Sequence, residues 1–141
     1  MVAHTAHHVG LTVTDIETAV EFYQSVFDCD IVAEFSVSGD AFETGVGIDG
    51  ASAQFAHLDL DSVRLELVAY EPAGEDRSTA ELNDPGATHL GVEVDDLDEF
   101  YASLDDGIET ISEPQTTDTG TKICFLRDPD AHLVEVLELD A

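Results

Sequence analysis

The fold is decided by a stretch close to the start of the chain. Residues 7–23 read HHVGLTVTDIETAVEFY. Apolar residues first recur at every second position, which is typical of a strand with one buried face: Val9, Leu11 and Val13. They then recur with the spacing of a helix face: Ile16, Ala19, Val20 and Tyr23. The stretch therefore predicts a strand followed at once by an amphipathic helix.

The same pattern returns in the second half of the chain. Residues 89–104 read HLGVEVDDLDEFYASL, and an offset of 81 places His89 on His8 and Gly91 on Gly10. The helix face also repeats at that offset, through Leu97, Phe100, Tyr101 and Leu104. Agreement in both the strand and the helix predicts two copies of one supersecondary unit.

Each copy is completed by further strand patterns, so the predicted unit is β-α-β-β-β, present twice. The further strands are expected near residues 30–37, 52–60 and 63–70, and again near 109–113, 121–127 and 132–139. A long loop is expected between Gly39 and Gly50. The chain is read as one domain, 1–141, made of a first module 1–70, a polar linker 71–86 and a second module 87–141.

The helix boundaries follow from capping residues. Thr14 with Glu17 predicts a capping box for the first helix, and Asp95 or Asp96 is expected to cap the second. Gly107 is the expected stop of the second helix.

The charge is strongly one-sided. Asp and Glu number 32 against 4 Lys and Arg, which gives a net charge of -28. That field excludes nucleic acid and anionic membranes as partners. Acidic residues spread over the whole chain indicate a cytoplasmic protein of a high-salt cell, where charge repulsion is screened; an acidic surface made for one basic partner is the competing interpretation. The sequence shows neither a membrane span nor a secretory signal.

Two histidines and two glutamates stand out as candidate metal ligands. His8 and His89 occupy equivalent strand positions, and Glu66 and Glu135 lie among aliphatic residues in the closing strand of each module. A buried carboxylate is costly unless it is paired or bound to a cation, and two His with two Glu suit a divalent ion. The alternative remains open that each His is a surface residue and that each Glu faces solvent.

The other histidines have no counterpart in the repeat. His4, His7, His57 and His132 are expected on the surface or in loops. In a regular strand His7 would point away from His8.

Four segments carry a family resemblance: HHVGLTVTDIETAVEFYQSVFDCDIV, LELVAYEP, THLGVEVDDLDEFYASL and FLRDPDAHLVEVLE. They resemble the vicinal oxygen chelate superfamily, which includes glyoxalase I, methylmalonyl-CoA epimerase, extradiol dioxygenases and fosfomycin or bleomycin resistance proteins. The resemblance implies an α+β fold in which tandem βαβββ modules curl around a metal cup, often as a homodimer. The usual Gly-Asn of the last hairpin is replaced by Ala131 and His132, which puts its tight turn in doubt.

The resemblance also implies a site and a chemistry. His8, Glu66, His89 and Glu135 match the family's metal ligands, with Glu135 or Glu66 as the catalytic base. The implied cofactor is one divalent ion of the Ni, Co, Zn, Mn or Fe group, and the implied activity is a lyase or isomerase that acts through an enediolate or enolate. An extradiol-type Fe(II) dioxygenase and a non-catalytic ligand-binding or resistance protein are the alternatives. With only four fixed cations in the chain, a small-molecule substrate is expected and a large polyanion is disfavoured.

Overall fold

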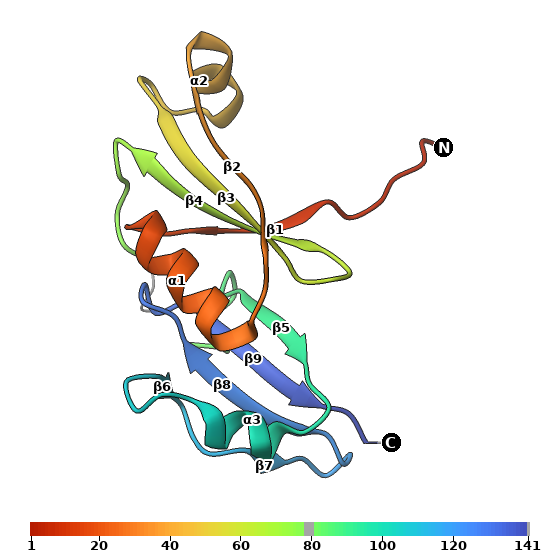
Figure 1. The fold of residues 1–141 in the computed structure, drawn as a ribbon. Coiled ribbons are helices and arrows are strands. Elements are labelled where there is room, and N and C mark those ends of the chain that lie inside the picture. Colours follow the sequence, from red (N-terminus) through yellow and green to blue (C-terminus); the bar gives the residue numbers. More distant parts are fainter. Residues whose placement is uncertain (78–80, 141) are drawn as a thin grey trace. The chain divides into compact units, whose positions relative to one another are not determined.

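The first half of the chain forms one four-stranded sheet with two helices. The computed structural model describes residues 1–77 and 81–140, and its contacts divide the chain into units Met1–Glu75 and Asp76–Ala141. The elements of the first unit are β1 (His8–Thr12), α1 (Ile16–Phe27), β2 (Ile31–Ser38), α2 (Asp40–Val46), β3 (Ser52–Asp59) and β4 (Arg64–Glu71). The strand order is β1-β4-β3-β2, with β1 parallel to β4 and the other neighbours antiparallel (Figure 1).

The second unit repeats this plan with shorter elements. They are β5 (His89–Glu93), α3 (Leu97–Ser103), β6 (Glu109–Thr110), β7 (Gln115–Thr116), β8 (Lys122–Arg127) and β9 (Leu133–Glu138). The strand order is β5-β9-β8-β6, with β5 parallel to β9 and β7 paired to β8 (Figure 1). The predicted α+β class, with two βαβββ-type sheets, is confirmed.

The two repeated helices, α1 and α3, each have an aspartate as the N-cap. The Asp15 side chain accepts a hydrogen bond from the Thr18 backbone N–H at 3.0 Å, so the predicted Thr14–Glu17 capping box is wrong. Asp96 caps α3 in the same way through Glu99. The predicted stop at Gly107 is also wrong, because α3 ends at Ser103 with Leu104 as its C-cap.

The loop expected between Gly39 and Gly50 contains the short helix α2. Gly47 follows this helix in the left-handed conformation, with φ 73°, so one of the expected loop glycines is a helix C-cap. The Glu43 carboxylate accepts a hydrogen bond from the Gly50 backbone N–H and closes the turn that follows. The glycine-rich stretch that was expected to be a loop therefore contains a helix of seven residues, about two turns long.

Alternation along the closing strands decides which face carries the site. Leu65 and Leu67 of β4 are fully buried, and α1 packs on β3 and β4. In the second unit Val134 and Val136 of β9 are equally buried. Because neighbouring residues of a strand point to opposite faces, Glu66 and Glu135 lie on the faces away from these aliphatic side chains.

The segment between the two sheets is polar, and its described residues, 72–77 and 81–88, contain no helix or strand. The expected linker, 71–86, begins inside β4, which ends at Glu71, and residues 81–86 contain turns. Residues 78–80 of that linker lie outside the described residues. No helix within residues 1–77 and 81–140 has the length and apolar character needed to cross a membrane.

Candidate functional site

The register of each sheet places one His–Glu pair on its open face. In β1 and β4 Gly10 lies opposite Glu66, and in β5 and β9 Gly91 lies opposite Glu135. The Nε2 atom of His8 is 3.5 Å from Oε2 of Glu66. In the second unit Nε2 of His89 is 3.5 Å from Oε1 of Glu135. The predicted pairs His8–Glu66 and His89–Glu135 are therefore brought together, each inside its own unit.

A glycine leaves room above each carboxylate. A Cβ atom at Gly10 would lie 3.9 Å from Oε1 of Glu66, and one at Gly91 would lie 4.0 Å from Oε1 of Glu135. Both distances are those of ordinary van der Waals contact, so each carboxylate has a glycine, with no side chain, as its neighbour on the adjacent strand.

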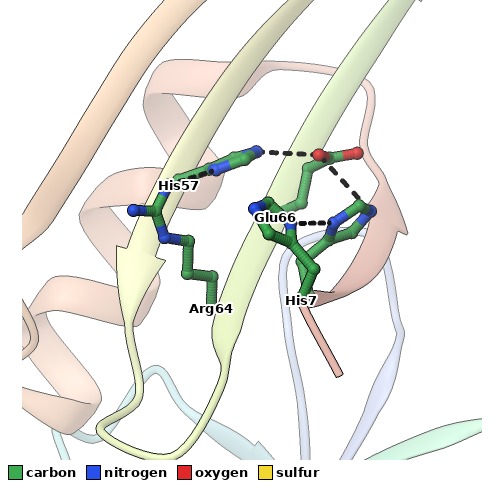
Figure 2. Close-up of polar contacts among 5 residues, drawn as sticks. His7, His57, Arg64 and Glu66 are labelled. Atoms are coloured by element: carbon green, nitrogen blue, oxygen red, sulfur yellow. Dashed lines mark hydrogen bonds and ion pairs between the residues drawn. The ribbon is translucent and has the colours of Figure 1, made fainter. Parts of the chain in front are cut away.

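His57 is the residue that the sequence analysis placed wrongly. It lies in β3, is only 5% exposed, and its Nε2 atom is 2.7 Å from Oε2 of Glu66. Its Nδ1 atom is 3.3 Å from Nη1 of Arg64, and Figure 2 shows its ring between the guanidinium and the carboxylate. His57 lacks a repeat partner because the second unit has Phe125 at that place in the sheet: His57 is in register with Glu66, and Phe125 with Glu135.

His7 also departs from expectation. The strand begins at His8, so the regular alternation that would turn His7 away does not extend to it. Nδ1 of His7 lies 2.8 Å from Nδ1 of His8, and one of the two atoms must donate. If His8 were to bind a cation through Nε2, its Nδ1 would carry the proton and donate to His7, a contact typical of ligating histidines.

The first unit has an aromatic wall beside its His–Glu pair. Phe35 packs edge-on against His57, with ring centroids 5.3 Å apart, and stacks on Phe55 at 5.0 Å. Phe42 of α2 contacts Phe55 and stacks on Tyr70. Phe35 remains 43% exposed, so the wall offers an apolar surface next to the polar pair.

The second unit surrounds its pair differently. The Phe125 ring lies edge-on to His89, with centroids 5.4 Å apart. The Glu135 side chain is 21% exposed, against 14% for Glu66. The carboxylate of the second unit is therefore the more accessible of the two and faces an apolar ring in place of an imidazole.

His132 lies in the last hairpin, as a loop residue, but it is structurally engaged. Its Nδ1 atom is 2.9 Å from Oδ2 of Asp128, whose carboxylate also accepts the backbone N–H groups of Asp130 and His132. The hydrogen bond to Asp128 raises the pKa of His132 above its ordinary value, although burial opposes it. The tight turn left in doubt by the sequence is formed with Ala131 in the left-handed conformation, at φ 64°.

The chemistry of the donors fits a divalent cation. Each pair supplies one imidazole nitrogen and one carboxylate oxygen, ligands that suit the borderline divalent metals. Within the described residues no group of three or more His, Cys, Asp or Glu side chains could hold a metal ion. The four-ligand set remains a prediction, because its two halves belong to separate units.

The chain matches the Glyoxalase/Bleomycin resistance protein/Dioxygenase superfamily over residues 5–136. The chain belongs to this superfamily. The family resemblance drawn from the sequence is thereby confirmed.

Individual proteins that are similar to this glyoxalase superfamily member support the same family and fold. The 2-epi-5-epi-valiolone epimerase of Actinomyces sp is 30% identical over 149 residues, which cover 99% of this chain and 81% of the relative. A glyoxalase family protein from Bacillus cereus superposes with a TM-score of 0.84 at 20% identity, over 98% of this chain and 95% of that one. A glyoxalase family protein from Enterococcus faecalis superposes with a TM-score of 0.69 at 24% identity, over 95% of this chain and 97% of that one. The two solved structures show the fold alone, which is glyoxalase-like.

Proposed function

We propose that this protein is a divalent-metal-dependent isomerase, specifically an epimerase of a small carbonyl compound. His8, Glu66, His89 and Glu135 are the proposed ligands of one ion of the Ni, Co, Zn, Mn or Fe group. The observation that carries the proposal is the repetition of the same pair: an imidazole Nε2 stands 3.5 Å from a carboxylate oxygen on the open face of each sheet. The 30% identity to an epimerase over almost the whole chain favours epimerisation over the lyase reaction of glyoxalase I.

The residues divide the work of moving a proton. The cation, when bound, supplies a Lewis acid that makes the hydrogen next to a carbonyl more acidic. Glu135 is the proposed base, because its side chain is the more exposed of the two glutamates. It removes that hydrogen as a proton, water delivers a proton to the other face of the same carbon, and Glu135 then releases its proton to water, which inverts the centre without net oxidation. Glu66 is the alternative base.

The charges of the protein restrict the substrate. Lys122 pairs with Asp98, Arg127 with Glu109, and Arg64 contacts His57. Three of the four fixed cations are thus engaged within their own units, which disfavours a substrate with several phosphate or carboxylate groups. A small, uncharged carbonyl compound fits best, and the substrate named for the Actinomyces relative is the first to test.

The deciding experiment follows hydrogen exchange in heavy water. The purified protein is analysed for bound metal, loaded with each candidate metal, and given the substrate named for the Actinomyces relative in D₂O. Proton NMR should show loss of one carbon-bound hydrogen signal together with the appearance of the epimer, with no need for oxygen. The activity should disappear after chelation and return when the metal is restored.

Other outcomes identify the other functions. Oxygen consumption with a catechol and Fe(II), without exchange, would assign an extradiol-type dioxygenase. Saturable binding with neither exchange nor oxygen uptake would assign a ligand-binding or resistance protein. Product formation from a hemithioacetal would move the assignment to the glyoxalase I reaction.

The net charge supports a further proposal about working conditions. At -28 the folded chain repels itself, and salt at about 1 M shortens the screening length to about 3 Å. We therefore expect the melting temperature to rise from low to multi-molar KCl, as in a protein of a high-salt cytoplasm. A melting temperature that does not change with KCl would favour an acidic surface made for a basic partner. Light scattering at high KCl tests the proposed homodimer.

A further inference from the structure

We propose that His57 is a positioning residue for Glu66, fixed by Arg64 in the one tautomer that can hold the carboxylate. This inference rests on the proposed function, because Glu66 needs to be oriented only as a ligand of the cation. His57 would not touch substrate or metal. It would act through the hydrogen bond between its Nε2 atom and Oε2 of Glu66, which measures 2.7 Å.

The tautomer follows from the group on the other side of the ring. The Arg64 guanidinium has donors and no acceptor, and its Nη1 atom lies 3.3 Å from Nδ1 of His57. Nδ1 must therefore accept, which leaves the proton of the neutral ring on Nε2. That N–H points at Glu66 and donates to it, as Figure 2 shows for the chain of contacts from Arg64 through His57 to Glu66.

The same argument excludes His57 as a metal ligand. His8, His57 and Glu66 have the composition of a metal-binding set of two histidines and one carboxylate within the first unit. A ligating nitrogen needs a free lone pair, and Nε2 of His57 carries the proton that Glu66 accepts. His8 differs, because its Nδ1 atom can donate to His7, and in that tautomer its Nε2 atom has a free lone pair.

The packing around His57 suits a fixed donor. The residue is 5% exposed, and Phe35 packs edge-on against its ring. The register of β3 with β4 places it directly opposite Glu66. The carboxylate thus receives its orientation from the sheet itself, with Oε2 held and Oε1 beside Gly10.

The second unit provides the natural contrast. Its residue in register with Glu135 is Phe125, which has no hydrogen-bond donor. Glu135 is therefore left without this restraint, as a base that takes up and returns a proton requires. The two carboxylates have diverged in role through one neighbouring side chain.

The first arm of the test uses the metal-free full-length protein. Long-range ¹H–¹⁵N NMR of the imidazoles should show His57 with its proton on Nε2, and Arg64→Met should weaken that preference. A wild-type ring with its proton on Nδ1 would overturn the proposal. This arm does not depend on metal binding or on activity, so it stands even if the proposed function fails.

The second arm measures Zn²⁺ affinity by competition with a chromophoric chelator at high KCl, where binding to the acidic surface is screened. His57→Phe, which copies the second unit, should weaken binding about 10–100-fold, the usual effect of losing an outer-shell partner. His57→Gln keeps an N–H donor and should restore most of the affinity. His4→Phe removes an exposed imidazole elsewhere and should change nothing.

The outcomes of the second arm separate the hypotheses. Unchanged affinity in His57→Phe would overturn the positioning role, and a loss as complete as that of His8→Ala would make His57 a ligand and overturn it as well. If the wild type binds Zn²⁺ weakly and neither His8→Ala nor Glu135→Gln changes that affinity, the metal site of the proposed function is refuted. The NMR measurement then still decides the tautomer of His57. Circular dichroism confirms folding, and His57→Gln replaces His57→Phe if the latter does not fold.

Discussion

The two sheets have the same backbone plan and differ in the side chains around their glutamates. In both, a parallel strand pair sets a glycine opposite the Glu, and a His nitrogen lies 3.5 Å from the carboxylate. The first unit adds His57, a buried imidazole, at the position where the second has Phe125. The repeated backbone therefore fixes the positions of the histidine and the glutamate in each sheet. The side chain in register with the glutamate, His57 or Phe125, then determines whether its carboxylate is held by a hydrogen bond.

The largest expected effect tests whether the two carboxylates have separate roles. At saturating metal, Glu135→Gln should lower the exchange rate about 10²–10⁴-fold, the range of a lost general base. Glu66→Gln should retain more of the rate, because Glu66 is proposed mainly as an oriented ligand. Deuterium incorporation followed by NMR measures both variants.

Equal losses in the two variants would show that the carboxylates share the work. Full turnover by Glu135→Gln would remove Glu135 from the base role and leave Glu66 as the base. Metal content measured on the same samples separates a lost base from a lost ligand.

The residues of the site show how far a sequence alone can lead. His8 and His89 could be found because the strand-helix stretch that contains them is repeated. Glu66 and Glu135 could be singled out as carboxylates among aliphatic residues, but alternation alone did not decide which face each of them occupies. His57 could not be found in this way, because the repeat has phenylalanine at its counterpart. Its alternation with Phe55 shows that the two share a face, but the pairing of β3 with β4, which brings His57 to Glu66, depends on turn geometry between the strands.

The fold shows the same division. Regular periodicity gave the long strands and both repeated helices. The short helix α2 and the two-residue strand β7 were not predicted, because a segment of two to seven residues carries too little periodicity to separate it from a loop. The strand expected near 109–113 is present as β6, which is shorter than predicted.

The second comparison concerns the cores on the opposite faces. Leu67 and Val136 each follow the site glutamate and are fully buried. Leu67→Ala should lower the free energy of unfolding by about 2–5 kcal/mol, and Val136→Ala by roughly 1.6 kcal/mol because fewer carbon atoms leave the core. Urea unfolding at constant KCl measures both changes. An equal or larger loss in Val136→Ala would mean that the smaller sheet relies more heavily on its core.

The third comparison concerns pH, where the hairpin of the second unit has a histidine–aspartate pair. The hydrogen bond to Asp128 raises the pKa of His132 in the folded protein, so protonation of this residue favours folding. Its contribution should be complete below the unfolded value of about 6.5 and should disappear as pH rises through the folded pKa. The His132 side chain is 25% exposed and the Asp128 side chain is buried, and a partly exposed pair of this kind contributes about 1 kcal/mol.

The measurement is the difference in unfolding free energy between the wild type and His132→Gln from pH 5 to 9. The wild type should have the larger free energy of unfolding at low pH, and the difference between the two proteins should diminish as pH rises. A difference that stays constant with pH would assign the role of His132 to neutral hydrogen bonding. Asp128→Asn, which removes the charge, should make the wild-type advantage at low pH disappear.

The smallest expected effect lies in the turns that close the two sheets. Both contain a non-glycine residue with positive φ, Asp61 at 71° and Ala131 at 64°. Aspartate tolerates this conformation, whereas alanine loses about 1–2 kcal/mol in it. Ala131→Gly should therefore stabilise the protein, although the greater freedom of glycine in the unfolded chain offsets about 0.5–1 kcal/mol of that gain. The expected net increase in the free energy of unfolding, measured with urea, is roughly 0.5–1 kcal/mol.

The matched control is Ala102→Gly, at an exposed position in α3. This substitution should destabilise the protein by about 1 kcal/mol. If both substitutions destabilise, the left-handed turn at Ala131 carries no strain, and the replacement of the family's usual glycine by alanine costs this hairpin nothing.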